Sequence, residues 1–174
     1  MAAVSKALVL STSDAASTKA VALAISQVAA AGDLVILAGE LGAGKTTFAQ
    51  GFAVGLGITE HVTSPTFTLV REYEGPGLGL RHLDVYRLEQ LSEATDLGLA
   101  EMLDEEAVML VEWGDAIVAA LPTDHLDVRI TFGAGDDDRR LELVPVGSRW
   151  SARMRALGDL LAKWADDGAG GAPC

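Results

Sequence analysis

A glycine-rich segment holds the residues whose types and spacing are most specific for chemistry. The segment GELGAGKTT fits the pattern G-x-x-x-x-G-K-[ST], with the fixed positions filled by Gly39, Gly44, Lys45 and Thr46. Glycines let the backbone curl so that successive N–H groups point at one phosphate, and a helix that begins there adds its positive end. The pattern therefore predicts a site for a nucleoside triphosphate, with Lys45 reaching the β- and γ-phosphates and Thr46 binding Mg²⁺. The alternative is a plain glycine-rich turn with a surface lysine, which does not require this order of residues.

A carboxylate ends an apolar run further along the chain. The run Ala107–Val111 predicts a buried central strand, and Glu112 follows it directly. In P-loop proteins a carboxylate at the end of a neighbouring parallel strand faces the magnesium ion, directly or through a water. Aspartate is usual there, and the longer glutamate makes direct ligation possible. The alternative is an ordinary charged residue at a strand end.

The segment Arg81–Arg87 combines three side chains that can move protons. In a strand, His82, Asp84 and Tyr86 share one face, while Leu83 and Val85 take the other. We expect Asp84 to orient or deprotonate an attacking water. An exposed strand face is the alternative, and a lone histidine is more often structural than catalytic.

Hydroxyl groups surround a proline between these segments, in Thr63–Thr68. Ser64 and Thr66 are placed to meet a γ-phosphate and to respond to its loss, as switch loops do. From the residues alone, a plain serine–threonine turn that leads into a strand is favoured over this interpretation. No motif fixes the residues that contact the base; the segment after Leu10 is one candidate. The three tryptophans are expected in the core or on a helix face rather than stacked on a base.

Hydrophobic periodicity and turn residues predict the elements that carry these segments. We expect helices over Asp14–Ala31 with Asp14 as N-cap, from the glycine-rich turn to about Leu56, over Ser92–Leu103 and over Trp150–Trp164. We expect strands over Lys6–Leu10 at a sheet edge, Leu34–Ala38, Thr66–Val70, Leu80–Tyr86, Ala107–Val111, and Leu126–Phe132 with Arg140–Val144 as a hairpin.

This order predicts an α/β protein with a P-loop NTPase-like three-layer fold, a mixed, partly parallel central sheet and a C-terminal β-hairpin plus helix. The 174 residues suit a single ATPase domain over residues 1–166, with a flexible Gly/Ala-rich tail over 167–174.

Composition narrows the classes of partner. The net charge is −12, with four Lys and nine Arg, so direct binding of DNA, tRNA or an anionic membrane is disfavoured. The longest uncharged stretch, Thr46–Thr59, is too short to span a bilayer, and the N-terminal apolar run is too weak for a signal peptide. A single cysteine, Cys174, excludes an internal disulfide and a cysteine-based zinc site. We expect a cytoplasmic protein.

The class of P-loop protein follows from what accompanies the glycine-rich segment. The chain has no Asn and therefore lacks the Asn-Lys-x-Asp motif with which GTPases read guanine. A small-molecule kinase stays possible, although arginines are scattered rather than gathered in an Arg-rich lid.

Four sequence blocks resemble the TsaE (YjeE) family, the small ATPases of bacterial tRNA threonylcarbamoyladenosine (t6A) biosynthesis. The blocks are LGAGKTTF followed by Gly51, SPTFTLV at Ser64–Val70, HLDVYRL at His82–Leu88 and VEW at Val111–Trp113. They occur in the family's order, and the similar span runs from about Leu34 to Leu121. One departure is Gly114 after Glu-Trp, where proline is common; it affects no expected ligand.

The resemblance implies Mg²⁺-dependent ATP hydrolysis, weak alone and dependent on the partner proteins TsaB and TsaD, of which TsaD transfers the threonylcarbamoyl group to tRNA. The tRNA would be met only indirectly, through that complex. By resemblance, residues 42–47 (Gly42, Ala43, Gly44, Lys45, Thr46 and Thr47) hold the phosphates, and Thr46 and Glu112 bind magnesium. The resemblance also implies that Asp84 is essential near the γ-phosphate, that Ser64–Thr66 is a switch, and that Trp113 is functional. Two alternatives stay open: a free-standing small-molecule kinase, and an assembly module that binds ATP without needing to split it.

Overall fold

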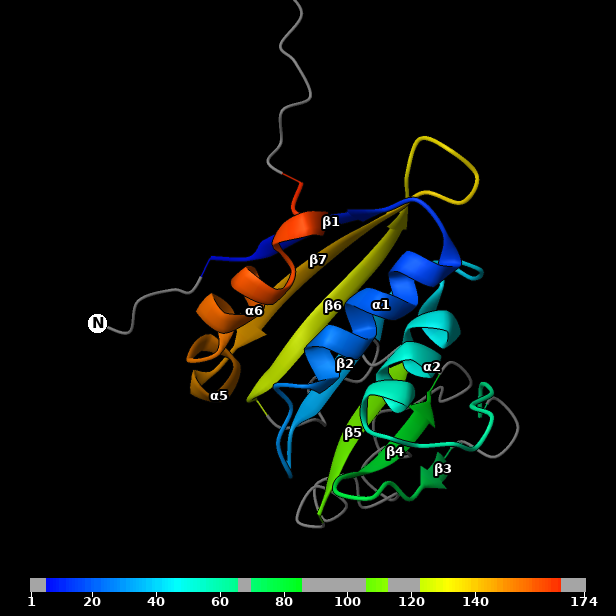
Figure 1. Ribbon diagram of the computed structural model, residues 1–174, viewed down its shortest axis with the longest axis vertical. Coiled ribbons are helices and arrows are strands. Elements are labelled where there is room, and N and C mark those ends of the chain that lie inside the picture. Colours follow the sequence, from blue (N-terminus) through cyan, green and yellow to red (C-terminus); the bar gives the residue numbers. More distant parts are fainter. Residues whose placement is uncertain (1–5, 66–69, 86–105, 113–122, 167–174) are drawn as a thin grey trace, which may run out of the picture.

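A seven-stranded mixed sheet forms the centre of the protein in a computed structural model that describes residues 6–65, 70–85, 106–112 and 123–166 (Figure 1). The strands are β1 (Leu8–Thr12), β2 (Leu34–Ala38), β3 (Val70–Tyr73), β4 (Gly79–Asp84), β5 (Ala107–Glu112), β6 (His125–Phe132) and β7 (Arg139–Val146). Their order across the sheet is β1-β7-β6-β2-β5-β4-β3. Strand β2 runs parallel to both β5 and β6, and β4 runs parallel to β5, whereas β1, β3 and β7 pair antiparallel. The predicted α/β class with a mixed, partly parallel sheet is confirmed.

The described helices pack against one face of this sheet. They are α1 (Ala15–Ser26), α2 (Lys45–Gly55), α5 (Ser148–Ser151), α6 (Met154–Leu160) and the 3-10 turn η2 (Ala162–Trp164). Figure 1 shows α1 and α2 side by side over the middle of the sheet, with α5 and α6 towards β7. Apolar side chains of α1, α2, α5 and α6 form one core with those of the seven strands, in which β3 takes part through Tyr73. The largest buried members include Phe48, Phe52, Ile25 and Trp150. Burial of this apolar surface is the main force that holds the helices to the sheet.

Two glycines bring α1 and α2 into close contact. A Cβ atom on Gly51 would lie 2.3 Å from the carbonyl oxygen of Lys19, and one on Gly55 would lie 1.8 Å from the hydroxyl of Ser26. Only glycine therefore fits at these two positions, one helical turn apart on α2. The close packing fixes α2, whose first turn carries Lys45 and Thr46.

Most predicted elements are confirmed, with shifted ends. Strand β1 lies at the sheet edge, β2 and β5 are buried central strands, and β6 and β7 form the expected hairpin. Strand β4 covers most of the predicted segment Leu80–Tyr86. The helix predicted over Ser92–Leu103, residues 66–69 of the predicted strand and the tail 167–174 lie outside the described residues. The described residues therefore do not test the prediction of a second helical layer.

Two predicted helices are wrong in extent. Asp14 is the N-cap of α1, with a reciprocal capping box to Ser17. The helix ends at Ser26 rather than Ala31, because the N–H groups of residues 27–29 donate to carbonyls three residues back instead of four. The next turn is closed by the N–H of Ala30, which donates to the carboxylate of Asp33. The predicted helix Trp150–Trp164 is divided into α5, α6 and η2, and its first break falls at Ala152 and Arg153. Arg153 there pairs with the buried carboxylate of Asp33, a tertiary contact that the helical pattern does not encode.

Candidate nucleotide site

Three parallel strands end together where the glycine-rich loop begins. Strand β2 leads into the loop, and its Leu37 is the register partner of Glu112 at the end of β5. Glu112 is in turn the register partner of Asp84 at the end of β4. In open α/β sheets, ligands bind at the carboxyl ends of the strands. The sheet thus brings the loop and both predicted carboxylates to one edge, on the face that α1 and α2 cover.

The loop backbone has the conformation that its glycines permit. Gly42 and Gly44 have φ values of 80° and 114°, in the left-handed region that other residues rarely adopt. A Cβ atom on either glycine would meet nothing within 4 Å, so the space beside both is open. Helix α2 begins directly after Gly44, and its first N–H groups have no partner within the helix. Such a loop and helix end favour an anion.

Lys45 is held at the loop rather than extended into solvent. Its side chain donates from Nζ to the carbonyl of Gly39 at 2.7 Å and to that of Glu40 at 3.0 Å. The residue is only 5% exposed. A buried ammonium fixed by backbone carbonyls is a point charge ready for a phosphate that enters the loop.

Glu112 joins the loop helix to β4. Its Oε1 accepts from the hydroxyl of Thr46 at 3.3 Å and lies 2.9 Å from Nε2 of His82. Glu112 and His82 are both buried, His82 completely. An ionised carboxylate only accepts, so Nε2 carries the hydrogen of this bond. Nδ1 of His82 has no hydrogen-bond partner within the described part of the chain.

Asp84 contacts the predicted switch segment. The hydroxyl of Ser64 donates to Oδ2 of Asp84 at 3.1 Å, and Asp84 is 4% exposed. The prediction that His82 and Asp84 share one strand face is confirmed, since both point to the side of Glu112 and Ser64. The alternative of a solvent-exposed strand face is wrong, because every residue of β4 is buried.

Some sequence-predicted residues lie outside the described residues. These are Thr66, Tyr86 and Trp113; Arg87, at the end of the segment Arg81–Arg87, also lies outside them. Trp150 lies in the core as expected, completely buried, and Trp164 packs against the core from its edge.

A small hollow of about 100 Å³ continues from the loop. It is lined by the start of α1, the loop and the β6–β7 turn: Asp14, Ala15, Thr18, Gly42, Ala43, Gly44, Thr47, Asp137 and Arg139. Thr47, a sequence-predicted phosphate ligand, lines this hollow together with Asp137 and Arg139, which the sequence does not predict as site residues. The hydroxyl and then the backbone N–H of Ser17 donate to Asp14 and lower the pKa of its carboxyl. Asp14 belongs to the segment after Leu10, which is a sequence-predicted candidate for contacts with the base. No sequence motif includes Asp137 or Arg139.

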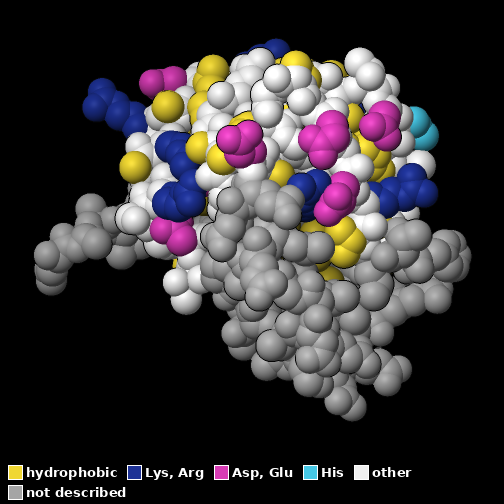
Figure 2. Space-filling view, turned by 90° about the horizontal axis from the view of Figure 1, so that it is seen from below, with side chains coloured by type: hydrophobic (Ala, Val, Ile, Leu, Met, Phe, Trp, Pro, Cys, Tyr) yellow, Lys and Arg dark blue, Asp and Glu magenta, His cyan; other side chains and the backbone are white. Residues whose placement is uncertain are grey.

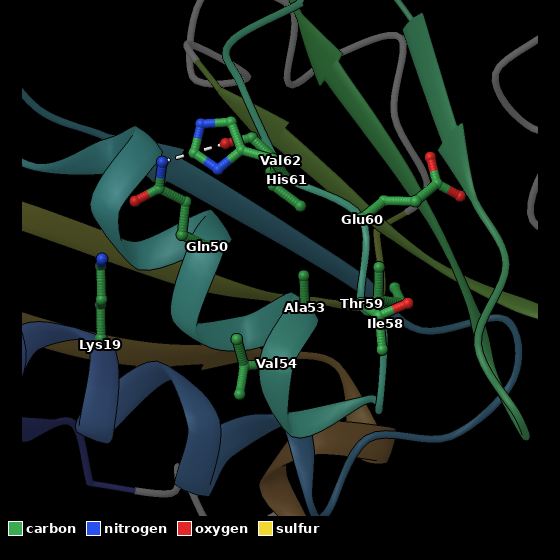
Figure 3. A pocket seen from close by; sticks show the side chains of 9 residues that line it. All are labelled: Lys19, Gln50, Ala53, Val54, Ile58, Thr59, Glu60, His61 and Val62. Atoms are coloured by element: carbon green, nitrogen blue, oxygen red, sulfur yellow. Dashed lines mark hydrogen bonds between the residues drawn. The ribbon is translucent and has the colours of Figure 1, made fainter.

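A larger hollow of about 290 Å³ lies further along α2, between Lys19 and the segment Ile58–Val62 (Figure 3). Figure 3 shows Gln50 reaching from α2 to that segment, where its amide donates to the carbonyl of Val62 at 3.0 Å. Gln50 lies one turn after Thr46 on α2, and Val62 precedes Ser64 by two residues. This bond therefore ties the loop helix to the segment that contacts Asp84.

The residues present fit a magnesium ion better than a metal held by protein alone. Within the described ranges, no group of three or more His, Cys, Asp or Glu side chains is placed to hold a metal. Magnesium in nucleotide sites takes only one or two protein oxygens and completes its shell with phosphate and water. The hydroxyl of Thr46 and the carboxylate of Glu112, already in contact, supply such a pair.

Charges are mixed on the face shown in Figure 2, where the described Lys and Arg side chains alternate with Asp and Glu among apolar ones. Within the described residues this face therefore offers no continuous basic surface of the kind that binds nucleic acid. No helix in the described ranges is long and apolar enough to cross a membrane.

Comparison with known proteins decides the family. A sequence model of the threonylcarbamoyl adenosine biosynthesis protein TsaE matches residues 12–141. The chain belongs to the TsaE family. The matched span contains the glycine-rich loop, Ser64, Asp84 and Glu112, and ends within β7.

Individual TsaE proteins are similar over most of their length. The tRNA threonylcarbamoyladenosine biosynthesis protein TsaE of Bacillus subtilis is 48% identical over 140 residues, 80% of this chain and 87% of that protein. The protein of the same name from Streptomyces coelicolor is 43% identical over 133 residues, 73% of this chain and 89% of that protein. Among solved structures, the crystal structure of YdiB from Bacillus subtilis superimposes with a TM-score of 0.77 at 41% identity, covering 88% of this chain and 95% of that one. The resemblance to TsaE and the fold expected from the sequence are thereby confirmed.

Proposed function

We propose that this TsaE-family chain binds ATP with Mg²⁺ and hydrolyses it to ADP and phosphate in support of t6A formation on tRNA. Its partners are the TsaB and TsaD counterparts, of which TsaD carries out threonylcarbamoyl transfer to the adenosine beside the anticodon. The observation that carries the proposal is the buried contact of Glu112 with both Thr46 and His82, beside Asp84 at the end of the neighbouring strand. A plain strand-to-helix turn has no need of two buried carboxylates at its mouth, since burying a charge is costly without a role or a partner.

The glycine-rich loop supplies the phosphate site of this proposal. The backbone N–H groups of residues 42–47 would donate to the phosphate oxygens, and the ammonium of Lys45 would pair with the β- and γ-phosphates. Lys45 lies at the loop already, within 3.0 Å of two of its carbonyls, so it needs little reorganisation.

Thr46 and Glu112 would hold the magnesium ion. When bound, the ion neutralises charge on the phosphate oxygens. His82 donates to the same oxygen of Glu112 that accepts from Thr46 and thereby orients the carboxylate. A second hydrogen bond of this kind is common behind metal ligands and fixes their geometry.

Asp84 is the group proposed to orient or deprotonate the attacking water, and Ser64 holds it in place through the 3.1 Å bond. Because Ser64 belongs to the segment expected to respond to the γ-phosphate, occupancy of the site and the position of Asp84 would be coupled. Hydrolysis alone would be slow and would rise when the partners complete the site.

The net charge of −12 supports action on proteins rather than on RNA. A direct RNA-binding protein needs a basic surface to displace counterions from phosphates. In this proposal TsaB and TsaD meet the tRNA, and the present chain meets them.

Replacement of Asp84 by Asn tests the proposal against its two alternatives. The Asp84→Asn variant is expected to bind ATP with Mg²⁺ as the unmodified chain does and to lose hydrolysis and t6A formation with TsaB and TsaD. The matched control is Asp159→Asn on the exposed side of α6, which should keep both. Full t6A formation by Asp84→Asn would instead identify an assembly module, and phosphate transfer to an added small molecule would identify a kinase.

A further inference from the structure

Arg139 connects the β6–β7 turn to the glycine-rich loop. It is the first residue of β7 and donates from Nε to the carbonyl of Ala43 at 2.8 Å and from Nη2 to that of Gly42 at 3.4 Å. These carbonyls belong to the loop that is proposed to hold phosphate. Arg139 lies 96 residues after Ala43 in the sequence, and the loop motif does not predict an arginine there.

The direction of these bonds matters for phosphate binding. In a trans peptide, the C=O and the N–H of the next residue point in opposite directions. Holding the carbonyl of Ala43 towards Arg139 therefore turns the N–H of Gly44 away from Arg139. Gly42 and Gly44 stand on either side of Ala43 with φ values of 80° and 114°, and glycine has more backbone freedom to lose than any other residue. A contact that fixes the carbonyls of Gly42 and Ala43 lowers the entropy cost of presenting the loop N–H groups to an anion.

The guanidinium group is itself fixed. Its Nη1 donates to the carbonyls of Asp136 and Asp138, both at 2.8 Å. Its carbon lies 4.7 Å from the ring centre of Phe132. The turn that carries these partners is closed by the N–H of Gly133, which donates to the carbonyl of Asp138 at 2.9 Å. Arg139 is thus a rigid link between a closed hairpin turn and a glycine-rich loop.

We propose that Arg139 is a positioning residue that pre-organises the glycine-rich loop and so sets its affinity for the phosphates of a nucleotide. The inference rests on the proposed function, because it needs the loop to bind a nucleotide. Its effect belongs to binding: loss of Arg139 raises the Kd for nucleotide and the KM for ATP, while kcat at saturating ATP changes little. Arg139 acts through Gly42 and Ala43 rather than by touching the reacting atoms.

The neighbouring residue supplies a matched control for charge and for hairpin stability. Arg140 lies on the same strand, is exposed, and pairs in register with Ser11 and Thr131. Arg140→Ala therefore removes the same charge close by without touching the loop. Arg139→Lys keeps the charge but lacks the planar group that reaches two loop carbonyls while it bonds its own turn.

The experiment measures the Kd of ADP with Mg²⁺ by titration calorimetry for the unmodified chain, Arg139→Ala, Arg139→Lys and Arg140→Ala. Hydrogen exchange of the Gly42–Lys45 amides, measured without nucleotide, gives a second readout. We expect Arg139→Ala to raise the Kd about tenfold or more, as lost hydrogen bonds from a charged donor do, and to speed exchange in the loop. The Kd of Arg139→Lys should lie between those of the unmodified chain and of Arg139→Ala. Arg140→Ala should match the unmodified chain in both Kd and exchange rate.

Two outcomes overturn the inference. The first is that Arg139→Ala binds ADP as tightly as Arg140→Ala does, and the second is that the loop amides of Arg139→Ala exchange at the unmodified rate. If Arg139→Ala does not fold, Arg139→Lys decides: an unchanged Kd then rejects the inference. An unmodified chain that binds no ADP at all would reject the proposed function instead, which separates the two failures.

Discussion

Glu112 and His82, 30 residues apart in sequence, share a buried hydrogen bond of 2.9 Å between Oε1 and Nε2. The same carboxylate oxygen accepts from Thr46 on α2. One oxygen atom thus joins the end of β5, the middle of β4 and the first turn of the loop helix. His82 and Glu112 are buried in a low-dielectric environment, where a hydrogen bond is strong. Loss of this bond would leave an unpaired polar group there and lower the stability of the fold.

Glu112→Gln is expected to weaken magnesium binding while leaving the shape of the site intact. An amide oxygen is a poorer ligand than a carboxylate for Mg²⁺, which prefers hard, charged oxygens. The affinity for ATP with Mg²⁺ should fall about tenfold or more, as changes around metal ligands do. Calorimetric titration with ATP, with Mg²⁺ and with EDTA, measures this.

The control for Glu112→Gln is binding without metal. Affinity for ATP in EDTA should stay close to that of the unmodified chain. Equal losses with and without Mg²⁺ would mean that Glu112 shapes the loop and does not hold the ion.

His82→Ala is expected to lower the free energy of unfolding by about 2–4 kcal/mol, because it leaves a cavity and removes a partner from a buried carboxylate. Chemical denaturation measures the change. The matched control is His61→Ala, because His61 is exposed and lines the larger hollow. This substitution should change the free energy of unfolding little. Equal stability of the two variants would contradict the buried His82–Glu112 bond.

Gly51→Ala is expected to destabilise the protein although alanine is the better helix former. The propensity gain is about 1 kcal/mol, but the new Cβ would lie 2.3 Å from the backbone of Lys19. Overpacking of this kind costs about 1–3 kcal/mol and more where backbone must move. Thermal melting should therefore show a lower midpoint. Gly77→Ala is the control, because a Cβ there meets nothing within 4 Å; a higher midpoint for Gly51→Ala would refute the close helix contact.

Asp14 should make stability depend on pH in acid. Hydrogen bonds from the hydroxyl and then the backbone N–H of Ser17 lower the pKa of Asp14 below its ordinary value of 3.8 in the folded chain. The ionised form is thus favoured by folding, so its contribution is complete well above 3.8 and is lost as the pH falls through 3.8 towards the lowered pKa.

Asp14→Asn keeps a capping side chain but cannot ionise. Its melting midpoint should lie below that of the unmodified chain at neutral pH, and the gap should close as the pH falls below 3.8. Ser17→Ala removes the hydroxyl that is the main cause of the lowered pKa of Asp14. The difference in melting midpoint between Ser17→Ala and the unmodified chain should therefore also narrow as the pH falls below 3.8. A gap that stays constant across this range would show that ionised Asp14 adds nothing to the cap.

The sequence predicts the parts of this fold in which local pattern and tertiary packing agree. Apolar runs give β2 and β5, and the glycine-rich motif gives the start of α2. The alternation in β4 places His82 and Asp84 on one face, as the contacts with Glu112 and Ser64 confirm. These features depend on residues a few positions apart.

Tertiary contacts account for what the sequence does not predict. The helical pattern of Trp150–Trp164 is broken where Arg153 pairs with Asp33, which is 120 residues away. The link from Arg139 to Ala43 likewise joins segments that no periodicity connects. The hydrogen bond between His82 and Glu112 requires the parallel pairing of β4 with β5, which strand spacing alone does not fix.

Magnesium-dependent ATP hydrolysis by the purified chain, alone and with its TsaB and TsaD counterparts, tests the central claim most directly. We predict a low rate alone that rises strongly when both partners are added and that Asp84→Asn abolishes. A substantial rate that the partners leave unchanged, or no hydrolysis with them at all, would contradict the proposed role in t6A formation.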